Sequence, residues 1–291
     1  MDDSLWIKLD GGNSNNVFRQ GDLVRRDRGK QSAATEALLI WLEHQGLGRV
    51  PTVVGGTKEF ELLSYVSGEA AFRPWSSFIR SVAWMTELGQ WLREYHDAVH
   101  GFVLPPGTTF LWGPEAAGPS MLVNHGDLGP WNTLHDGAHL TGVIDWDLAR
   151  FGSPLDDLAQ IALEAVPLKP STADRLGENP PRHLIEQRLE ALCAGYGDVD
   201  SEAVWRHAGN YLERMADEVE AASSLGRQPF VDWVEHGVPT DYRAESSFIR
   251  GQVHEKSVEP PLLTSVIPHC GHQHVEQDQR VNGNGQIERH E

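Results

Sequence analysis

Short apolar runs separated by turn-forming residues fill the first part of the chain, and this pattern predicts β-strands. The predicted strands cover residues 17–19, 23–25, 52–54 and 60–66. Between the second and third of them, Ala34, Leu38 and Leu42 recur at helical spacing, which predicts an amphipathic helix over residues 31–45. We therefore expect residues 1–66 to form a β-rich N-terminal lobe.

Beyond residue 66 the apolar positions follow a helical period. Within this region Asp136-Gly137 separates two strand-like runs and predicts a β-hairpin. The helical pattern fades near Glu245. We therefore expect a larger, mostly helical lobe over residues 67–244, a disordered tail over residues 245–291, and an α+β fold for the whole.

The composition is that of a folded protein, with 40% hydrophobic residues and ten tryptophans. The N-terminus carries neither a basic segment nor an apolar stretch, and no run approaches the ~20 apolar residues that a membrane helix needs. The two cysteines, Cys193 and Cys270, lie far apart and do not suggest a disulfide framework. We expect a cytoplasmic protein with no membrane partner.

The formal net charge of −18 at pH 7 argues against a nucleic-acid partner, because nucleic-acid binding depends on clustered Lys and Arg. An acidic surface attracts polycationic molecules, but it also simply keeps an enzyme soluble. Charge alone therefore does not identify a substrate, and the sequence leaves the oligomeric state open.

Polar residues flank the predicted hairpin at a spacing suited to phosphoryl transfer. His125-Gly126-Asp127 is followed, after four intervening residues, by Asn132, and Asp145 ends the returning strand. Phosphoryl transfer needs a carboxylate that orients the attacking hydroxyl, and oxygen ligands that hold Mg²⁺ beside the phosphates. Asp127 offers the first function. Asn132 and Asp145 offer the second, because a hairpin places them at nearly paired positions.

This stretch resembles the catalytic core of the aminoglycoside phosphotransferases and choline kinases, which are small-molecule relatives of protein kinases. The kinase loop H-R-D-x-x-x-x-N is matched by His125-Gly126-Asp127 and Asn132, with Gly in place of Arg. The kinase motif D-F-G is matched by Asp145-Trp146-Asp147. Residues 152–159 resemble the G-x-P-x-x-D-L-A stretch of the group.

The resemblance implies a two-lobed protein-kinase-like fold, with a nucleotide-binding lobe over residues 1–66 and a catalytic and substrate-binding lobe over residues 67–244. It implies ATP or GTP as the phosphate donor and Mg²⁺ as the cofactor. By the same resemblance Asp127 is the expected catalytic residue, and Asn132 and Asp145 are the expected metal ligands.

Further nucleotide-binding residues follow from the resemblance by position. Arg25 takes the place of the usual phosphate-binding Lys, with Glu36 as its helix partner, while Arg26 is an alternative cation. In the glycine-rich loop the expected residue is Ser14, and at the hinge between the lobes Ser64 and Val66 are expected to contact the base.

Two other functions remain open for these residues. One is a metal-dependent hydrolase that uses His125, Asp127, His135 and Asp145 as ligands. The other is a nucleotide-binding regulator that has lost its chemistry, which the unusual Arg25 suggests. The expected function is a small-molecule kinase, with an aminoglycoside or another small hydroxyl compound as acceptor. His125 and Asp157 are expected to position the catalytic loop.

Overall fold

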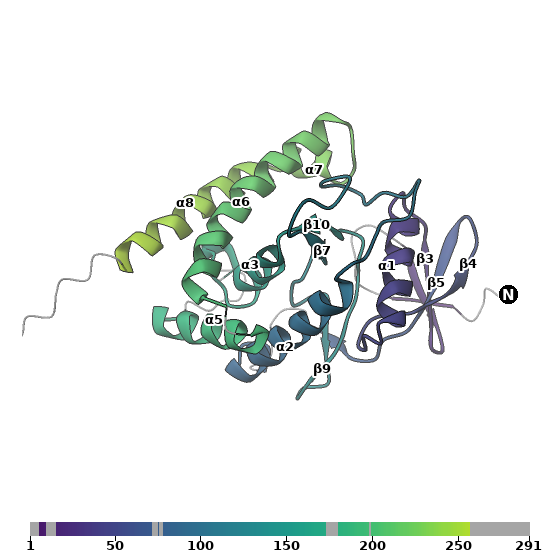
Figure 1. Ribbon diagram of the computed structural model, residues 1–291, viewed down its shortest axis with the longest axis horizontal. Coiled ribbons are helices and arrows are strands. Elements are labelled where there is room, and N and C mark those ends of the chain that lie inside the picture. Colours follow the sequence, from purple (N-terminus) through teal and green to yellow (C-terminus); the bar gives the residue numbers. More distant parts are fainter. Residues whose placement is uncertain are drawn as a thin grey trace, which may run out of the picture. The chain divides into compact units, whose positions relative to one another are not determined.

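Five short antiparallel strands form the first sheet, in the order β1-β2-β3-β5-β4 (Figure 1). Their bounds are Ile7–Lys8 (β1), Val17–Gln20 (β2), Leu23–Asp27 (β3), Val53–Gly56 (β4) and Phe60–Ser64 (β5). The turn between β2 and β3 contains Gly21 at φ 61°, a conformation that glycine adopts at little cost. The strands predicted in this region are confirmed, and β1 is an additional one.

The computed structural model describes residues 6–9, 16–71, 75, 78–172, 180–197 and 199–256. These residues belong to one compact unit. Ser14 lies outside the described residues, as does residue 257 onward.

Helix α1 (Ser32–His44) confirms the helix predicted over residues 31–45. Its apolar face is fully buried and contacts β4 and helix α2 (Val82–Val99). The buried apolar side chains of this face are Ala34, Leu38, Leu39 and Leu42. Near the end of the helix the Trp41 indole donates a 2.8 Å hydrogen bond to the Ala98 carbonyl of α2. The first sheet is thereby connected through α1 to the helical region.

Two small sheets lie in the middle of the chain. One has the order β6-β8-β9 and the other pairs β10 with β7. The bounds are Glu69–Ala70 (β6), Leu122–Asn124 (β7), Thr133–His135 (β8), Leu140–Val143 (β9) and Arg150–Gly152 (β10). Gly137 has φ 93°, and the Asp136 carboxylate accepts hydrogen bonds from the backbone N–H groups of Ala138 and His139. The predicted Asp-Gly hairpin is therefore confirmed.

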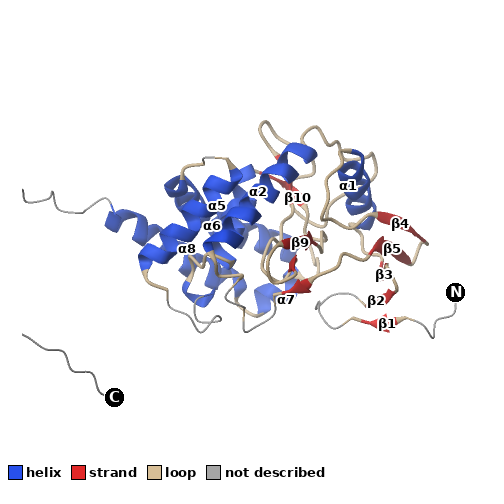
Figure 2. Cartoon of the chain, turned by 90° about the horizontal axis from the view of Figure 1, so that it is seen from below, coloured by secondary structure: helices blue, strands red, loops and turns tan. Residues whose placement is uncertain are grey.

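Helices make up most of the remaining described chain (Figure 2). Besides α2 they are α3 (Pro154–Glu164), α5 (Arg182–Tyr196), α6 (Ser201–Ser224), α7 (Phe230–Glu235) and α8 (Val238–Lys256). Helix α2 contributes three buried aromatic side chains, Trp84, Trp91 and Tyr95. Trp91 stacks on Tyr95, and the buried Trp146 packs edge-on against both. Within the described residues, none of the helices combines the length and the apolar character that a membrane crossing requires.

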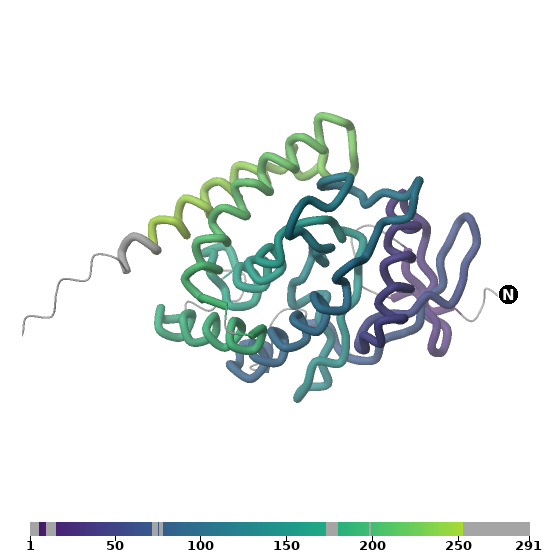
Figure 3. The backbone as a smooth tube through the Cα atoms, in the orientation of Figure 1, coloured from purple at the N-terminus to yellow at the C-terminus, as the bar shows by residue number. Residues whose placement is uncertain are grey.

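Helix α8 continues to Lys256, so the helical region extends beyond the predicted end at residue 244. The tube in Figure 3 shows α8 running alongside α6. Their contact depends on small residues: Ser246 is fully buried and donates a hydrogen bond to the Gly209 carbonyl, while Ile249 packs beside it. A contact made by small and polar residues leaves a weak apolar stripe, which explains why the periodicity did not reveal it.

Helices α2 and α5 pack closely because each carries a glycine at the contact. A Cβ atom on Gly89 would overlap the Leu192 carbonyl oxygen and lie 2.9 Å from the Tyr196 nitrogen. A Cβ atom on Gly195 would overlap the backbone of Thr86 in the same way. No ordinary side chain fits at either position without moving one helix.

We predict that Gly89→Ala lowers the free energy of unfolding by about 1–3 kcal/mol, because overpacking outweighs the gain in helix propensity. The matched control is Gly251→Ala, since Gly251 is an exposed helical glycine with open space around its Cβ position. This control should raise the free energy of unfolding by about 0.5–1 kcal/mol. Urea unfolding curves of the three proteins test both values, and equal effects of the two changes would contradict the close contact.

Candidate active site

The catalytic loop, residues 125–132, connects β7 to β8 and begins with a buried histidine. The His125 Nε2–H group donates a 3.1 Å hydrogen bond to the Ile144 carbonyl, and Nδ1 accepts one from the Asp127 backbone N–H. Burial lowers the pKa of His125 to about 4, so the ring is neutral at pH 7. Both ring nitrogens bind backbone groups, so His125 positions the loop.

Gly126 has φ 80°, and a Cβ atom there would overlap the Leu148 carbonyl oxygen. Glycine at this point of the loop is therefore required by the backbone, and the Arg of the protein-kinase motif would not fit the same geometry.

A single carboxylate holds the start of the loop. Asp157 on α3 accepts hydrogen bonds from the backbone N–H groups of His125 (3.1 Å) and Gly126 (3.4 Å) and from the Asn124 amide (3.3 Å). The His96 ring lies 3.2 Å from the same carboxylate, which is only 1% exposed. Asp157 thus fixes the position of the first residues of the catalytic loop, as the sequence analysis expected.

Gln160, one turn further along α3, holds the other side of the same loop. Its Oε1 accepts a 2.8 Å hydrogen bond from the Leu128 N–H group, and its Nε2 donates to the Gly126 carbonyl. These two bonds flank Asp127 on both sides. Sequence reasoning did not single out Gln160, although its spacing of three from Asp157 places both on one helix face.

The Asp127 carboxylate is oriented through one of its two oxygens. Oδ2 accepts hydrogen bonds from the Asn132 amide (2.8 Å) and the Trp131 indole (3.3 Å). Among the hydrogen bonds of the described residues, none is accepted by Oδ1. Burial and the nearby charge of Asp145 raise the pKa of Asp127 to about 7. Asp127 thus has one fixed oxygen, one oxygen open to a ligand, and the proton affinity of a general base.

Asn132 and Asp145 come together across the hairpin. Thr133 pairs with Val143, and the Ile144 N–H group donates a 2.9 Å hydrogen bond to the Asn132 carbonyl, so Asp145 follows one residue beyond the pair. The Asn132 amide nitrogen is bound to Asp127, which leaves its side-chain oxygen for a ligand.

The Asp145 side chain is 45% exposed, and its backbone has φ 63°, in the left-handed region that costs a non-glycine residue energy. A carboxylate oxygen and an amide oxygen at one place are hard ligands of the kind that Mg²⁺ prefers. The residues present therefore fit a magnesium ion.

The structure corrects the expected pairing of Arg25 with Glu36. Arg25 lies among the rings of Trp6, Phe18 and Phe60, with its guanidinium carbon 5.0–5.6 Å from their centroids. Glu36 instead pairs with Arg28, which follows β3. Successive side chains of a strand point to opposite faces, so one position along β3 decides which cation faces the site.

Arg26, the alternative cation, faces the candidate active site. It is buried and forms ion pairs with Glu61 on β5, with Asp147 at 2.9 Å and with Asp145 at 3.6 Å. Sequence reasoning missed Glu61 as a partner. Glu61 lies directly opposite Arg26 on the neighbouring strand. Knowledge of the register between β3 and β5 would therefore have identified it.

Ser64 and Val66 lie at the connection from the first sheet to the second. The Ser64 hydroxyl accepts a 2.8 Å hydrogen bond from the Thr52 N–H group, and its own N–H group donates to the Thr52 carbonyl. The Val66 side chain packs against Gly142 of β9. Both residues therefore occupy the segment between the lobes, and their contact with a nucleotide base stays a prediction.

The ligand set of the alternative hydrolase does not assemble. Both ring nitrogens of His125 are bound to backbone groups, and His135 Nδ1 accepts a hydrogen bond from the Gly137 N–H group. In the part of the chain that the structure describes, no group of three or more His, Cys, Asp or Glu side chains is arranged to hold a metal ion.

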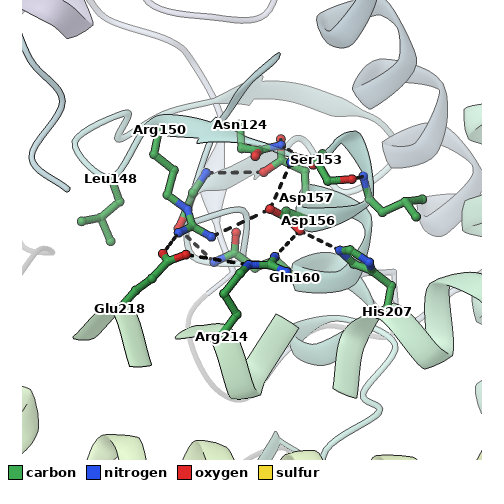
Figure 4. A network of polar contacts seen from close by, with 12 residues as sticks. Asn124, Leu148, Arg150, Ser153, Asp156, Asp157, Gln160, His207, Arg214 and Glu218 are labelled. Carbon is green, nitrogen blue, oxygen red and sulfur yellow. Dashed lines mark hydrogen bonds and ion pairs between the residues drawn. The ribbon is translucent and has the colours of Figure 1, made fainter. Parts of the chain in front are cut away.

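A charged network connects α3 and β10 to α6, next to the loop anchor Asp157 (Figure 4). Asp156 accepts hydrogen bonds from His207 and Arg214, while Arg150 pairs with Glu218 and lies over the Trp112 ring. Burial alone would raise the pKa of Asp156, but these partners lower it below its ordinary value. The network fixes α6 against the first turn of α3, because Asp156 directly precedes the loop anchor Asp157.

The model of the phosphotransferase enzyme family matches residues 109–201, which include the catalytic loop and α3. The trifolitoxin immunity protein of Rhizobium leguminosarum bv. trifolii is 31% identical to this chain over 198 residues, which is 66% of the chain and 74% of the relative. The chain belongs to the phosphotransferase enzyme family. The matched range contains Asp127, Asn132 and Asp145.

Solved structures of the family share the fold. A macrolide 2′-phosphotransferase from Brachybacterium faecium superposes with a TM-score of 0.54 at 18% identity, covering 83% of this chain and 93% of that one. The gentamicin complex of the phosphotransferase APH(2″)-IIa gives a TM-score of 0.53 at 13% identity, covering 83% and 90%. At these identities the likeness concerns the fold, and it confirms the expected two-lobed kinase-like architecture.

We predict that Asp157→Asn loosens the catalytic loop. An amide oxygen cannot accept all of these hydrogen bonds as a carboxylate does, and the amide N–H₂ group faces donors, so unfolding should become easier by about 1–3 kcal/mol. Urea unfolding measures this loss. The control is Asp97→Asn, an exposed carboxylate next to His96 that pairs with Arg93. An equal effect of both changes would contradict the anchoring role.

We also predict a dependence of stability on pH through Asp156. Its pKa is lowered in the folded state, so the stabilisation is present above the unfolded pKa of about 4 and is lost as the pH falls through the folded pKa. Asp156→Asn should therefore show a flatter fall in the free energy of unfolding below about pH 4 than the wild type. Urea unfolding at several acidic pH values checks this, and parallel curves would contradict it.

Proposed function

We propose that this protein is a magnesium-dependent small-molecule kinase that transfers the γ-phosphate of ATP or GTP to a hydroxyl group. The observation that carries the proposal is the Asp127 carboxylate, held by Asn132 and Trp131 through one oxygen and open at the other. Asp145 lies across the hairpin from Asn132, and its negative charge is close enough to raise the pKa of Asp127. A base beside two oxygen ligands is the arrangement that phosphoryl transfer needs.

Each residue has a distinct task in this proposal. Asp127 orients the acceptor hydroxyl and accepts its proton as the new bond forms. Asn132 and Asp145 would hold Mg²⁺, which supplies charge neutralisation at the transferring phosphate. From β3, Arg26 is the cation that faces the site, and Ser64 and Val66 lie where the nucleotide base is expected.

A small molecule is the proposed acceptor, and the similar proteins suggest an antibiotic. Gentamicin is bound in one similar structure, and another is a macrolide phosphotransferase. The relative that is 31% identical is an immunity protein, which supports a protective role in the cell. The net charge of −18 favours a cationic acceptor. A cytoplasmic location, where nucleotides are available, belongs to the same proposal.

We predict that Asp127→Asn reduces kcat for phosphoryl transfer by about 10²–10⁴-fold, because the amide orients the hydroxyl poorly and takes no proton. Nucleotide binding should persist. The assay measures ADP and GDP release with Mg²⁺ and a panel of aminoglycosides, macrolides, choline and small hydroxylated metabolites. The control is Asp136→Asn in the turn of the same hairpin, where Asn suits the turn equally well.

The outcomes of this assay separate the candidate functions. Acceptor-stimulated release that vanishes in Asp127→Asn but survives in Asp136→Asn supports the kinase and identifies its acceptor class. Release that is unaffected by Asp127→Asn would refute the proposed base. Tight nucleotide binding without turnover on any acceptor would favour a nucleotide-binding regulator.

A further inference from the structure

Arg26 is surrounded by three carboxylates from both sides of the site. Its Nε atom bonds to Glu61, Nη2 lies 2.9 Å from Asp147, and Nη1 lies 3.6 Å from Asp145. Arg26 is 7% exposed and Glu61 is 1% exposed. One buried cation therefore connects the first sheet to the segment that follows β9.

The sheet fixes this arrangement. Arg26 and Glu61 are direct cross-strand partners on β3 and β5, so their side chains leave the sheet on the same face. The charge of Glu61 then reaches Nε, the innermost nitrogen of the guanidinium group. In the usual kinase arrangement the partner of the strand cation comes from the helix, but here Glu36 of α1 is bound to Arg28.

The three guanidinium nitrogens are engaged to different extents. Nε and Nη2 have close carboxylate partners, whereas the 3.6 Å separation of Nη1 from Asp145 is longer than a hydrogen bond. An arginine fork donates in several fixed directions at once. A lysine amine is a single point of charge on a flexible stem, so it cannot serve Glu61, Asp147 and a third anion in separate directions.

We propose that Glu61 and Asp147 are positioning residues that hold Arg26 by Nε and Nη2, so that Nη1 is directed at the phosphates of the nucleotide. This inference rests on the proposed function, since it takes a nucleotide as the ligand. It also gives a reason for arginine where lysine is usual: this site has an additional carboxylate, Asp147, that the cation must satisfy. When Nη1 binds phosphate, the Asp145 carboxylate no longer pairs with Arg26 and is available to the proposed Mg²⁺.

The test is nucleotide binding by the full chain, measured with fluorescent ATP and GTP analogues in the presence of EDTA, so that no turnover enters the result. Arg26→Lys should weaken binding about tenfold, because the amine is captured by the two carboxylates. The matched control is Arg25→Lys. It makes the same change one residue earlier, on the opposite face among aromatic rings that a lysine also contacts, and it should leave binding unchanged.

Two further variants test the positioning residues. One keeps the negative charge of Glu61 but shortens its side chain, and the other removes the Asp147 carboxylate that competes for the lysine amine. Glu61→Asp keeps the charge but shortens the reach to Nε, so it should weaken nucleotide binding several-fold in the same binding measurement. In the double variant R26K/D147N the lysine has one carboxylate fewer, so part of the lost affinity should return. A purely structural role would not produce this recovery. Thermal unfolding establishes that each variant is folded, and Glu61→Asp tests the proposal if Arg26→Lys is not.

The inference and the proposed function fail in different ways. If the wild type binds neither nucleotide analogue, both are overturned. If the wild type binds and Arg26→Lys binds equally well, or Arg25→Lys weakens binding as much, the inference alone is overturned. If Glu61→Asp leaves nucleotide binding unchanged, or Asp147→Asn gives no recovery in the Arg26→Lys background, that residue has no positioning role.

Discussion

The Asp157 carboxylate is the contact on which the rest of the site depends. It is buried beneath the catalytic loop and receives the backbone of His125 and Gly126, the Asn124 amide and the His96 ring. A buried carboxylate is stable only with such partners, and the backbone groups would otherwise be unsatisfied. The carboxylate and the backbone N–H groups of the loop each require the other as a partner, and this fixes the start of the loop in one conformation.

Around this anchor the fold supplies rigidity from several directions. Helix α3 provides both the anchor and Gln160, the Asp156 network connects α3 to α6, and α2 brings His96 through its close contact with α5. The Tyr196 hydroxyl of α5 lies 2.8 Å from the second nitrogen of His96. Contacts from four helices, made directly or through one another, therefore hold this short loop in place. The exposed Asp145 side chain lies beside this stable core.

Local patterns in the sequence predicted most of the fold and the centre of the site. Apolar periodicity and the Asp136-Gly137 turn gave the elements, and the spacing of Asp127, Asn132 and Asp145 gave the arrangement around the hairpin. Features that depend on strand register or on helix packing could not be predicted from the sequence. Which of Arg25 and Arg26 faces inward depends on where β3 begins its alternation, Glu61 became a partner only through strand pairing, and α8 packs through small residues without an apolar stripe.

The left-handed backbone at Asp145 bears on how such a protein can evolve. A glycine or asparagine adopts φ 63° more readily than aspartate does, so replacing Asp145 by either would relieve about 1 kcal/mol of strain or leave the fold untouched. The change that removes the proposed metal-binding carboxylate therefore carries no backbone penalty, and its cost is the loss of the ion pair with Arg26. In the proposed function, this single substitution would separate an active chain from an inactive one whose backbone is no more strained.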